Sequence, residues 1–240
     1  MKTEMVDYFH KDQKLIGYLA YNSDISGKRP AVLVVHDWSG RNGFSCKQAE
    51  MLAKLGYVGF AVDMYGDARV GESTEEKMAL MEPLASDRVL LRQRIQAAYD
   101  TVCSLDMVDT KKIAAIGFCF GGMVVLDLAR TGIDMAGVVS FHGLLGKPFD
   151  VETQPIKAKT LVLHGYDDPM VKPEDVRHFC DEMTKAGADW QTHMYGNTLH
   201  AFTNPAAHDA TMGTVYSATA EKRAFMSMIV FLKEIFDINK

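Results

Sequence analysis

The feature that most constrains the fold is an alternation of short apolar runs with longer segments of helical periodicity. Several short runs are apolar at nearly every position, as in strands that are covered on both faces. Strands that alternate with helices in this way are typical of βαβ units and of a mainly parallel sheet. The runs that predict strands are 15–21, 31–36, 58–62, 113–116, 137–141, 160–164 and 190–195.

Helical periodicity is clearest in two segments. Apolar residues recur at helical spacing over 91–105 and over 225–236, which predicts two amphipathic helices packed on the sheet. Ser73 with Glu76 three residues later is a capping-box signature, so a further helix is expected to begin there and to end near Pro83. No repeat, linker or charge block interrupts this order, and we expect residues 1–240 to form a single α/β domain.

The composition excludes several classes of protein. Of 240 residues, 48% are apolar and 24% charged, which is the balance of a globular protein with a large core. A net charge of −5 provides no field that would attract nucleic acid. No apolar run reaches the ~18 residues that span a bilayer, and the first ten residues lack the apolar core of a signal peptide. We therefore expect a cytoplasmic protein without nucleic-acid or membrane partners.

The four cysteines contain no C-x-x-C pair, and no H-E-x-x-H spacing occurs, so no metal site is predicted. The most informative of them is Cys119, within Ile113-Ala-Ala-Ile-Gly-Phe-Cys-Phe-Gly-Gly122. This is a strand, a glycine-bracketed turn and the start of a helix, with cysteine where the G-x-S-x-G nucleophile elbow has serine. A helix N-terminus favours the reactive thiolate, so the segment predicts a nucleophilic cysteine.

Two other interpretations of this turn were weighed. Gly117, Cys119 and Gly122 occupy the G-x-G-x-x-G positions of a dinucleotide loop, but a cysteine at the middle position blocks the approach of a pyrophosphate. The next predicted strand also carries Ser140 near its end rather than the acid that would bind a ribose. The second alternative is a buried structural cysteine, which is common for cysteines on helix faces. The strand–turn–helix context favours the nucleophile.

An activated nucleophile needs a base and a group that orients the base. In the order nucleophile, acid, histidine, the loop after 160–164 supplies Asp167 and Asp168, and the loop after 190–195 supplies His200. Pro169 restricts the preceding residue to an extended conformation that suits an inward side chain, so we favour Asp168 over its neighbour. His36 and His142 end strands on the side where the site is expected and are candidate pocket residues.

These residues resemble the dienelactone hydrolase family of α/β-hydrolases. The resemblance covers most of the chain and rests on three motifs in order: Gly117-Phe-Cys-Phe-Gly-Gly122, Gly165-Tyr-Asp-Asp-Pro-Met-Val171 and His200-Ala-Phe202. It implies a mainly parallel twisted sheet of about seven or eight strands with helices on both faces. It also implies a catalytic triad of Cys119, His200 and Asp168.

The resemblance extends to the loop after the third strand. In the family, an acidic residue there interacts with the resting cysteine, and the N–H of the next residue completes the oxyanion hole. Those positions fall on Asp37 and Trp38, although the family more often has Glu at the first of them. The second oxyanion donor is expected to be the N–H of Phe120, directly after the nucleophile.

The substrate is less well specified. Dienelactone hydrolases proper bind the substrate carboxylate with arginines, one of them shortly after the catalytic histidine, where this chain has Asn204. An amide side chain cannot make a bidentate charge-assisted bond, and Arg69 or Lys77 are the alternative sources of charge. The residues expected to line an apolar pocket are Trp38, Tyr65, His142 and Phe202.

The sequence therefore predicts a cofactor-free cysteine hydrolase, monomeric or homodimeric, acting on small-molecule esters or lactones and preferring neutral ones, with activated phosphotriesters as a side activity. One alternative is a carboxymethylenebutenolidase proper that acts on anionic dienelactones. A rival of another class is a thiol redox or ligand sensor that uses Cys119 without turnover.

Overall fold

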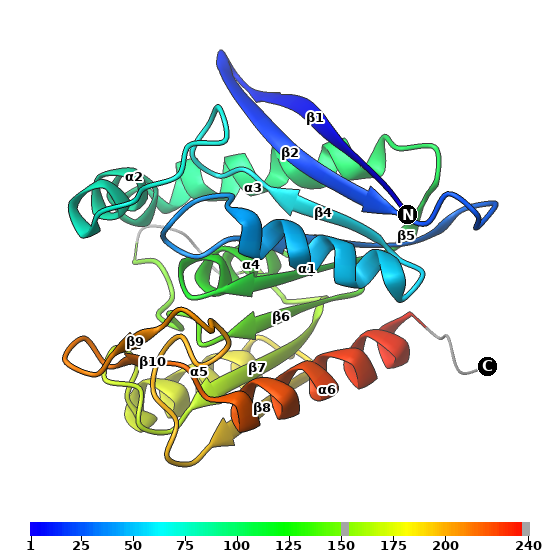
Figure 1. The fold of residues 1–240 in the computed structure, drawn as a ribbon. Helices are drawn as coiled ribbons and strands as arrows, with labels where there is room; N and C mark the ends of the chain where they lie inside the picture. Colours follow the sequence, from blue (N-terminus) through cyan, green and yellow to red (C-terminus); the bar gives the residue numbers. More distant parts are fainter. Residues whose placement is uncertain (150–153, 237–240) are drawn as a thin grey trace. The chain divides into compact units, whose positions relative to one another are not determined.

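The computed structural model describes residues 1–149 and 154–236, and the chain divides into two compact units, Met1–Ile116 and Gly117–Lys240. In the described residues the elements comprise a mixed sheet of eight strands, a two-stranded ladder and six helices (Figure 1). The predicted α/β fold with about seven or eight strands is confirmed. That residues 1–240 form a single domain stays a prediction.

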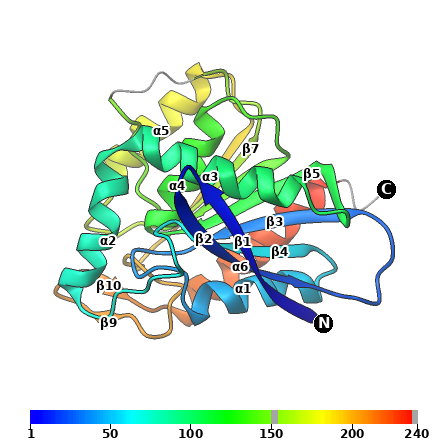
Figure 2. The same ribbon diagram turned by 90° about the horizontal axis from the view of Figure 1, so that it is seen from above.

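The first unit contains the antiparallel part of the sheet. Its elements are β1 (Lys2–His10), β2 (Gln13–Tyr21), β3 (Arg29–Val35), α1 (Gly43–Lys54), β4 (Val58–Val62), α2 (Thr74–Ser86), α3 (Arg88–Cys103) and β5 (Val108–Phe118), whose last two residues belong to the second unit. β1 and β2 form a hairpin, β2 pairs antiparallel with β4, and β4 pairs in parallel with β3. α1 and α3 cover opposite faces of β3 and β4 (Figure 2).

The second unit continues with parallel strands. Its elements are α4 (Phe120–Arg130), β6 (Gly137–Phe141), β7 (Lys159–Gly165), α5 (Pro173–Lys185), β8 (Trp190–Tyr195), β9 (His208–Asp209), β10 (Thr214–Val215) and α6 (Ala218–Ile235). β7 pairs in parallel with β6 on one side and with β8 on the other. α5 and α6 lie on opposite faces of these strands (Figure 2). All five residues of β6 are buried, as expected for a strand covered on both faces.

Strand positions follow the apolar runs closely. β4, β6 and β8 have the predicted bounds, whereas β5 begins five residues before the predicted 113–116 run and ends two residues after it. The added N-terminal part of β5 is mostly polar and only Val108 in it is buried, so no apolar run marked it. β1 was not predicted for the same reason, since most of its residues are exposed.

The helix expected at Ser73 forms, but it is longer than predicted. The Ser73 hydroxyl accepts from the N–H of Glu76 and the Glu76 carboxylate accepts from the N–H of Ser73, both at 3.2 Å, so the capping box is present. The helix passes through Pro83 and ends at Ser86. A proline removes one helical hydrogen bond without ending the helix when neighbouring turns hold it, so the expected end near Pro83 was too early.

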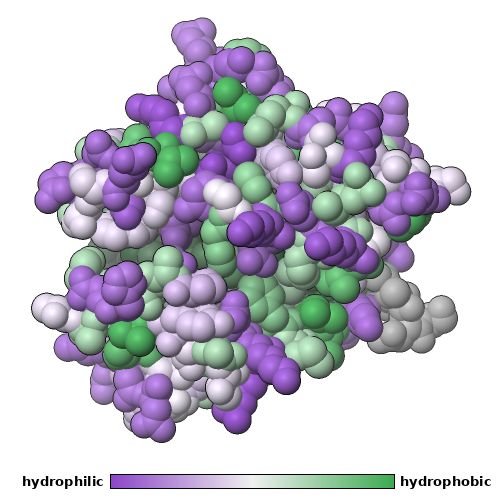
Figure 3. Space-filling model, viewed as in Figure 1, coloured by the Kyte–Doolittle hydropathy of each residue, from purple (hydrophilic) through white to green (hydrophobic). Residues whose placement is uncertain are grey.

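α6 packs through one face and leaves the other exposed. Its buried residues, Ala220, Ala224, Met228, Phe231 and Leu232, recur at helical spacing, which confirms the predicted amphipathic pattern. Over α6, hydrophobic and hydrophilic residues are mixed on the face that Figure 3 shows.

In the part of the chain that the structure describes, no helix combines the length and the apolar character needed to cross a membrane.

Candidate active site

Cys119 occupies the turn between β5 and α4. Its backbone has φ 52° and ψ −113°, a conformation that costs a non-glycine residue free energy and that clusters at functional sites. Its N–H donates to the carbonyl of Phe141 at 3.0 Å, and its own carbonyl accepts from the N–H of Gly122 at 2.9 Å. The thiol is half-buried and stands at the N-terminus of α4, where the helix dipole favours negative charge.

Glycines make this turn sterically feasible. A Cβ on Gly117, near the end of β5, would collide with the backbone carbonyl of Gly121 in the first turn of α4, so only glycine fits. A Cβ on Gly122 would lie 2.6 Å from both the Cα of Gly143 and the hydroxyl oxygen of Ser140. These close approaches explain why glycines flank the cysteine on both sides, as the elbow interpretation requires.

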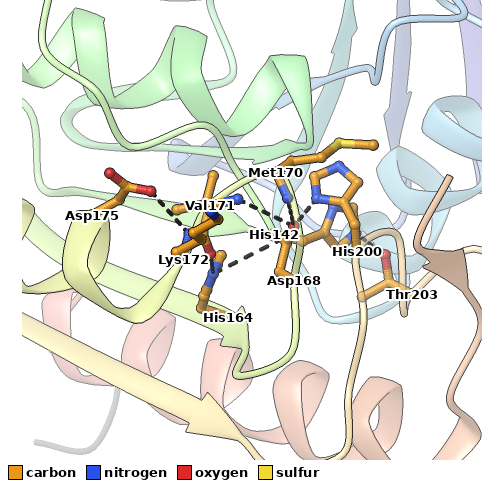
Figure 4. Close-up of polar contacts among 9 residues, drawn as sticks. All are labelled: His142, His164, Asp168, Met170, Val171, Lys172, Asp175, His200 and Thr203. Carbon is orange, nitrogen blue, oxygen red and sulfur yellow. Dashed lines mark hydrogen bonds and ion pairs between the residues drawn. The ribbon is translucent and has the colours of Figure 1, made fainter.

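Asp168 is the acid that the structure brings to His200. The carboxylate is 2% exposed, and its Oδ2 accepts from Nδ1 of His200 at 2.7 Å (Figure 4). Its Oδ1 accepts from the N–H groups of Met170 and Val171 at 2.8 and 3.3 Å. Asp167 is exposed, and its carboxylate instead accepts from the N–H of Thr198 at 3.1 Å. The preference for Asp168 therefore agrees with the geometry.

His200 is held by backbone bonds on both sides. Its N–H donates to the carbonyl of Gly213 at 2.9 Å, and its carbonyl accepts from the N–H of Val215 at 3.0 Å. The side chain is 1% exposed. Its Nε2 makes no hydrogen bond of standard geometry with any described residue, so this nitrogen is available for proton transfer.

The charge state of His200 is strongly perturbed. Burial lowers the pKa of its imidazole, but the attraction of a Cys119 thiolate and the hydrogen bond to Asp168 outweigh burial and raise that pKa to about 10. An imidazole with such a pKa is protonated at neutral pH. A positive charge on His200 beside Cys119 is suited to stabilising a negative charge that develops on sulfur during nucleophilic attack.

Two other buried histidines lie beside His200 and Asp168. The ring of His142 contacts the ring of His200 edge to face, with centroids 5.1 Å apart, and it also contacts Phe202 at 5.1 Å. Nε2 of His164 donates to the carbonyl of Val171 at 3.0 Å and lies 3.9 Å from Oδ2 of Asp168. The sequence analysis singled out His142 and Phe202 but not His164, although its place at the end of a strand, four residues before the acid, was a usable signal.

Asp37, Trp38 and Tyr65 are among the predicted residues in the first unit. The hydroxyl of Tyr65 donates to the carbonyl of Trp38 at 2.9 Å, so these two are brought together. The carboxylate of Asp37 accepts from the N–H of Ser39 at 2.8 Å. That the Trp38 N–H serves an oxyanion hole and that Asp37 interacts with the resting Cys119 stay predictions.

Asn204 stabilises a turn. Its side-chain oxygen accepts from the N–H of Ala206 at 2.9 Å, and its N–H donates to the carbonyl of Ala201 at 2.9 Å. In the first unit, Arg69 donates to the backbone carbonyls of Tyr65 and Gly66, and Lys77 lies 5.6 Å from the ring centroid of Trp38.

Within the described ranges, no group of three or more His, Cys, Asp or Glu side chains is placed to hold a metal ion.

The architecture is that of an α/β-hydrolase. An α/β-hydrolase from a Medee basin deep-sea metagenome library superposes with a TM-score of 0.64 at 17% identity and covers 98% of both chains, which supports the fold. The sequence pattern of the dienelactone hydrolase family matches residues 15–236. The chain belongs to the dienelactone hydrolase family, a family of hydrolases.

Two further relatives are similar along most of their length. A protein of Aquifex aeolicus named putative carboxymethylenebutenolidase is 28% identical over 211 residues, 86% of this chain and 89% of that protein. The crystal structure of a dienelactone hydrolase-like promiscuous phosphotriesterase from metagenomic libraries is 37% identical, covers 98% of both chains and superposes with a TM-score of 0.91. Their names describe activities of those proteins.

The surroundings of His200 predict how its imidazole titrates. We expect its imidazole to lose its proton near pH 10 and, in Cys119→Ala, at a pH closer to the ordinary 6.5, because the thiolate that raises the pKa is gone. Side-chain NMR of histidine-labelled protein, with His200→Gln to assign the signal, measures both midpoints. A midpoint that does not move in Cys119→Ala would refute the influence of Cys119 on the imidazole.

Proposed function

We propose that this chain cleaves small-molecule carboxylic esters or lactones through a thioester on Cys119. The observation that carries the proposal is the 2.7 Å hydrogen bond from His200 to the buried Asp168. The influence of Cys119 on the pKa of the same imidazole supports it. A histidine oriented by a carboxylate beside a thiol on a strained turn is an arrangement suited to nucleophilic catalysis.

In the proposed acylation, the Cys119 thiolate forms a bond to the substrate carbonyl carbon, and the carbonyl electron pair moves to oxygen. The tetrahedral intermediate collapses as the C–O bond to the leaving group breaks. His200 then donates the proton on Nε2 to the departing alkoxide, and Asp168 stabilises the imidazolium before that transfer. The products of this half-reaction are an alcohol and a thioester.

Deacylation reverses the role of the histidine. Neutral His200 accepts a proton from water, the resulting hydroxide attacks the thioester carbonyl, and the C–S bond breaks to release the acid and the thiolate. We assign the oxyanion donors to the N–H groups of Phe120 and Trp38. Phe120 begins α4, and the unpaired N–H groups at a helix N-terminus favour negative charge. The assignment of the Trp38 N–H rests on the family resemblance alone.

We further propose that the preferred substrates are neutral. Asn204 occupies the position of the family arginine and is engaged in a turn, and Arg69 donates to backbone carbonyls. A buried substrate carboxylate would therefore lack a bidentate cation. The alternative, an enzyme acting on anionic dienelactones, is supported by the name of the Aquifex aeolicus relative. In either case we expect Trp38, Tyr65, His142 and Phe202 to line the pocket.

A second candidate activity is attack on activated phosphotriesters. The donors that hold a carbonyl oxyanion can also stabilise the phosphoryl oxygen of such a substrate. The metagenomic relative at 37% identity carries the name of a promiscuous phosphotriesterase, which supports this side activity.

The first test addresses the nucleophile. We expect Cys119→Ala to lower turnover of p-nitrophenyl acetate by roughly 10⁵-fold or more, because no other group would form the acyl intermediate. Iodoacetamide should abolish activity in parallel with labelling of Cys119, whereas Cys180→Ala should respond as the unmodified chain does. Stoichiometric oxidation of Cys119 in a protein without ester turnover would instead favour the thiol sensor.

The second test separates the adjacent acids. Asp168→Asn should lower kcat by about three to four orders of magnitude, because an amide does not maintain the imidazole tautomer that the reaction needs. Asp167→Asn changes an exposed side chain of similar size and should stay within about twofold of the starting activity. Equal losses in the two variants, measured by steady-state kinetics, would contradict the assignment.

The third test concerns substrate charge. A missing charge-assisted contact of ~1.5 to 3 kcal/mol corresponds to roughly a tenfold to hundredfold lower kcat/KM for a carboxylate-bearing lactone than for its neutral analogue. Asn204→Arg should recover part of this loss and leave the neutral substrate nearly unchanged. A starting protein that already prefers the anionic lactone would overturn the preference for neutral substrates and leave the nucleophile assignment intact.

A further inference from the structure

The proposed reaction does not explain why His142 is a histidine. The residue follows β6, is 2% exposed and has a backbone φ of 39°. A positive φ costs a residue with a Cβ free energy, and it persists where the surroundings hold it. Here the N–H of His142 donates to the carbonyl of Leu163 at 2.9 Å. The strained backbone therefore directs this side chain to one place.

The His142 side chain lies against the loop that carries His200 and contacts both His200 and Thr203. Nε2 of His142 lies 2.8 Å from the hydroxyl oxygen of Thr203, which is fully buried (Figure 4). The His142 ring meets the His200 ring at an interplanar angle of 65°, with centroids 5.1 Å apart. Since Thr203 follows His200 by three residues, one hydrogen bond ties the segment after β6 to the loop that carries the proposed base.

A histidine provides what an apolar ring would not. Phenylalanine could supply the same edge-to-face packing, but its ring could turn about its own axis. The hydrogen bond to Thr203 restrains that rotation, so the edge facing His200 is defined. Nδ1 of His142 has no hydrogen-bond partner among the described residues, and a buried unsatisfied polar atom is unfavourable. A histidine at this position therefore carries a free-energy cost at Nδ1, and its hydrogen bond to Thr203 through Nε2 is the contact that offsets it.

The ring also has to remain uncharged. Burial, followed by the charges of His200 and His164, holds the pKa of His142 well below its ordinary value. Burial likewise lowers the pKa of His164, which faces Asp168. Of these three buried imidazoles, only that of His200 has a raised pKa. A neutral His142 can contact the imidazolium without repelling it.

We propose that His142 and Thr203 are positioning residues for His200: their hydrogen bond fixes the His142 ring, and that ring holds the His200 imidazole in register with Asp168 and Cys119. The kinetic consequence rests on the proposed function, whereas the effect on the imidazole itself does not. Misplacement of a reacting group by a fraction of an ångström or more lowers the rate without weakening substrate binding to the same degree.

The test uses two substitutions of Thr203. Thr203→Val keeps the shape and removes the bond, whereas Thr203→Ser keeps the hydroxyl. We expect Thr203→Val to lower kcat for p-nitrophenyl acetate roughly tenfold to hundredfold with KM within about twofold, and to lower the NMR titration midpoint of His200. Thr203→Ser should restore both. Ser227→Ala is the matched control, because it removes a comparable bond of 3.1 Å from Nδ1 of His193.

A substitution of His142 tests the same positioning role if Thr203→Val does not fold. His142→Phe retains a ring without the hydrogen bond and should produce the same fall in kcat and in the His200 midpoint. Variants whose melting temperature falls while kcat and the midpoint stay at their starting values would overturn the positioning role. If the unmodified chain does not turn over esters, the proposed function fails, and the His200 midpoint in these variants alone decides this inference.

Discussion

The site in the second unit depends on the negative charge of Asp168, whose carboxylate has almost no access to water. Removing an ionised group from water costs several kcal/mol unless a partner charge and hydrogen bonds replace the solvent. Here the N–H groups of Met170 and Val171 satisfy one oxygen and the imidazole of His200 satisfies the other. The loops after β7 and β8 therefore have to meet, because neither can satisfy this charge alone.

The second constraint is the backbone at Cys119. A positive φ at a residue with a Cβ is unfavourable, and it is tolerated because all of α4 behind it is buried and packed. The absence of side chains at Gly117 and Gly122 permits the close approach of Gly121 and Gly143. Strain at one residue is thus offset by the packing of a whole helix, and the thiol is presented at the start of that helix.

These two constraints together determine where the proton resides. Three imidazoles are buried near one another, and burial alone would lower the pKa of all of them. His200 differs because Cys119 and Asp168 together outweigh the effect of burial on its pKa, whereas burial dominates at His142 and His164 and lowers the pKa of both. In the proposed reaction this distribution gives a single imidazole that can donate and accept a proton, with neutral rings around it.

Much of the fold and of the site was predictable because the signals were local. Apolar runs identified buried strands such as β4 and β6, glycines on both sides marked the turn at Cys119, and Pro169 favoured Asp168. β1 and the beginning of β5 were not predicted, because exposed polar strands have no apolar run. Thr203 was not singled out, since its partner His142 lies 61 residues earlier and no periodicity relates the two.

The sequence by itself determined the alternation of buried strands and helices, the turn at Cys119 and the residue types of the candidate site, because each of these depends on neighbours in the chain. Only the tertiary structure decided how the buried Asp168 carboxylate is satisfied, which of three histidines has a raised pKa and which hydroxyl contacts His142. Those properties depend on burial and on distances between residues that are far apart in the chain, and a pKa responds to what surrounds a group in space.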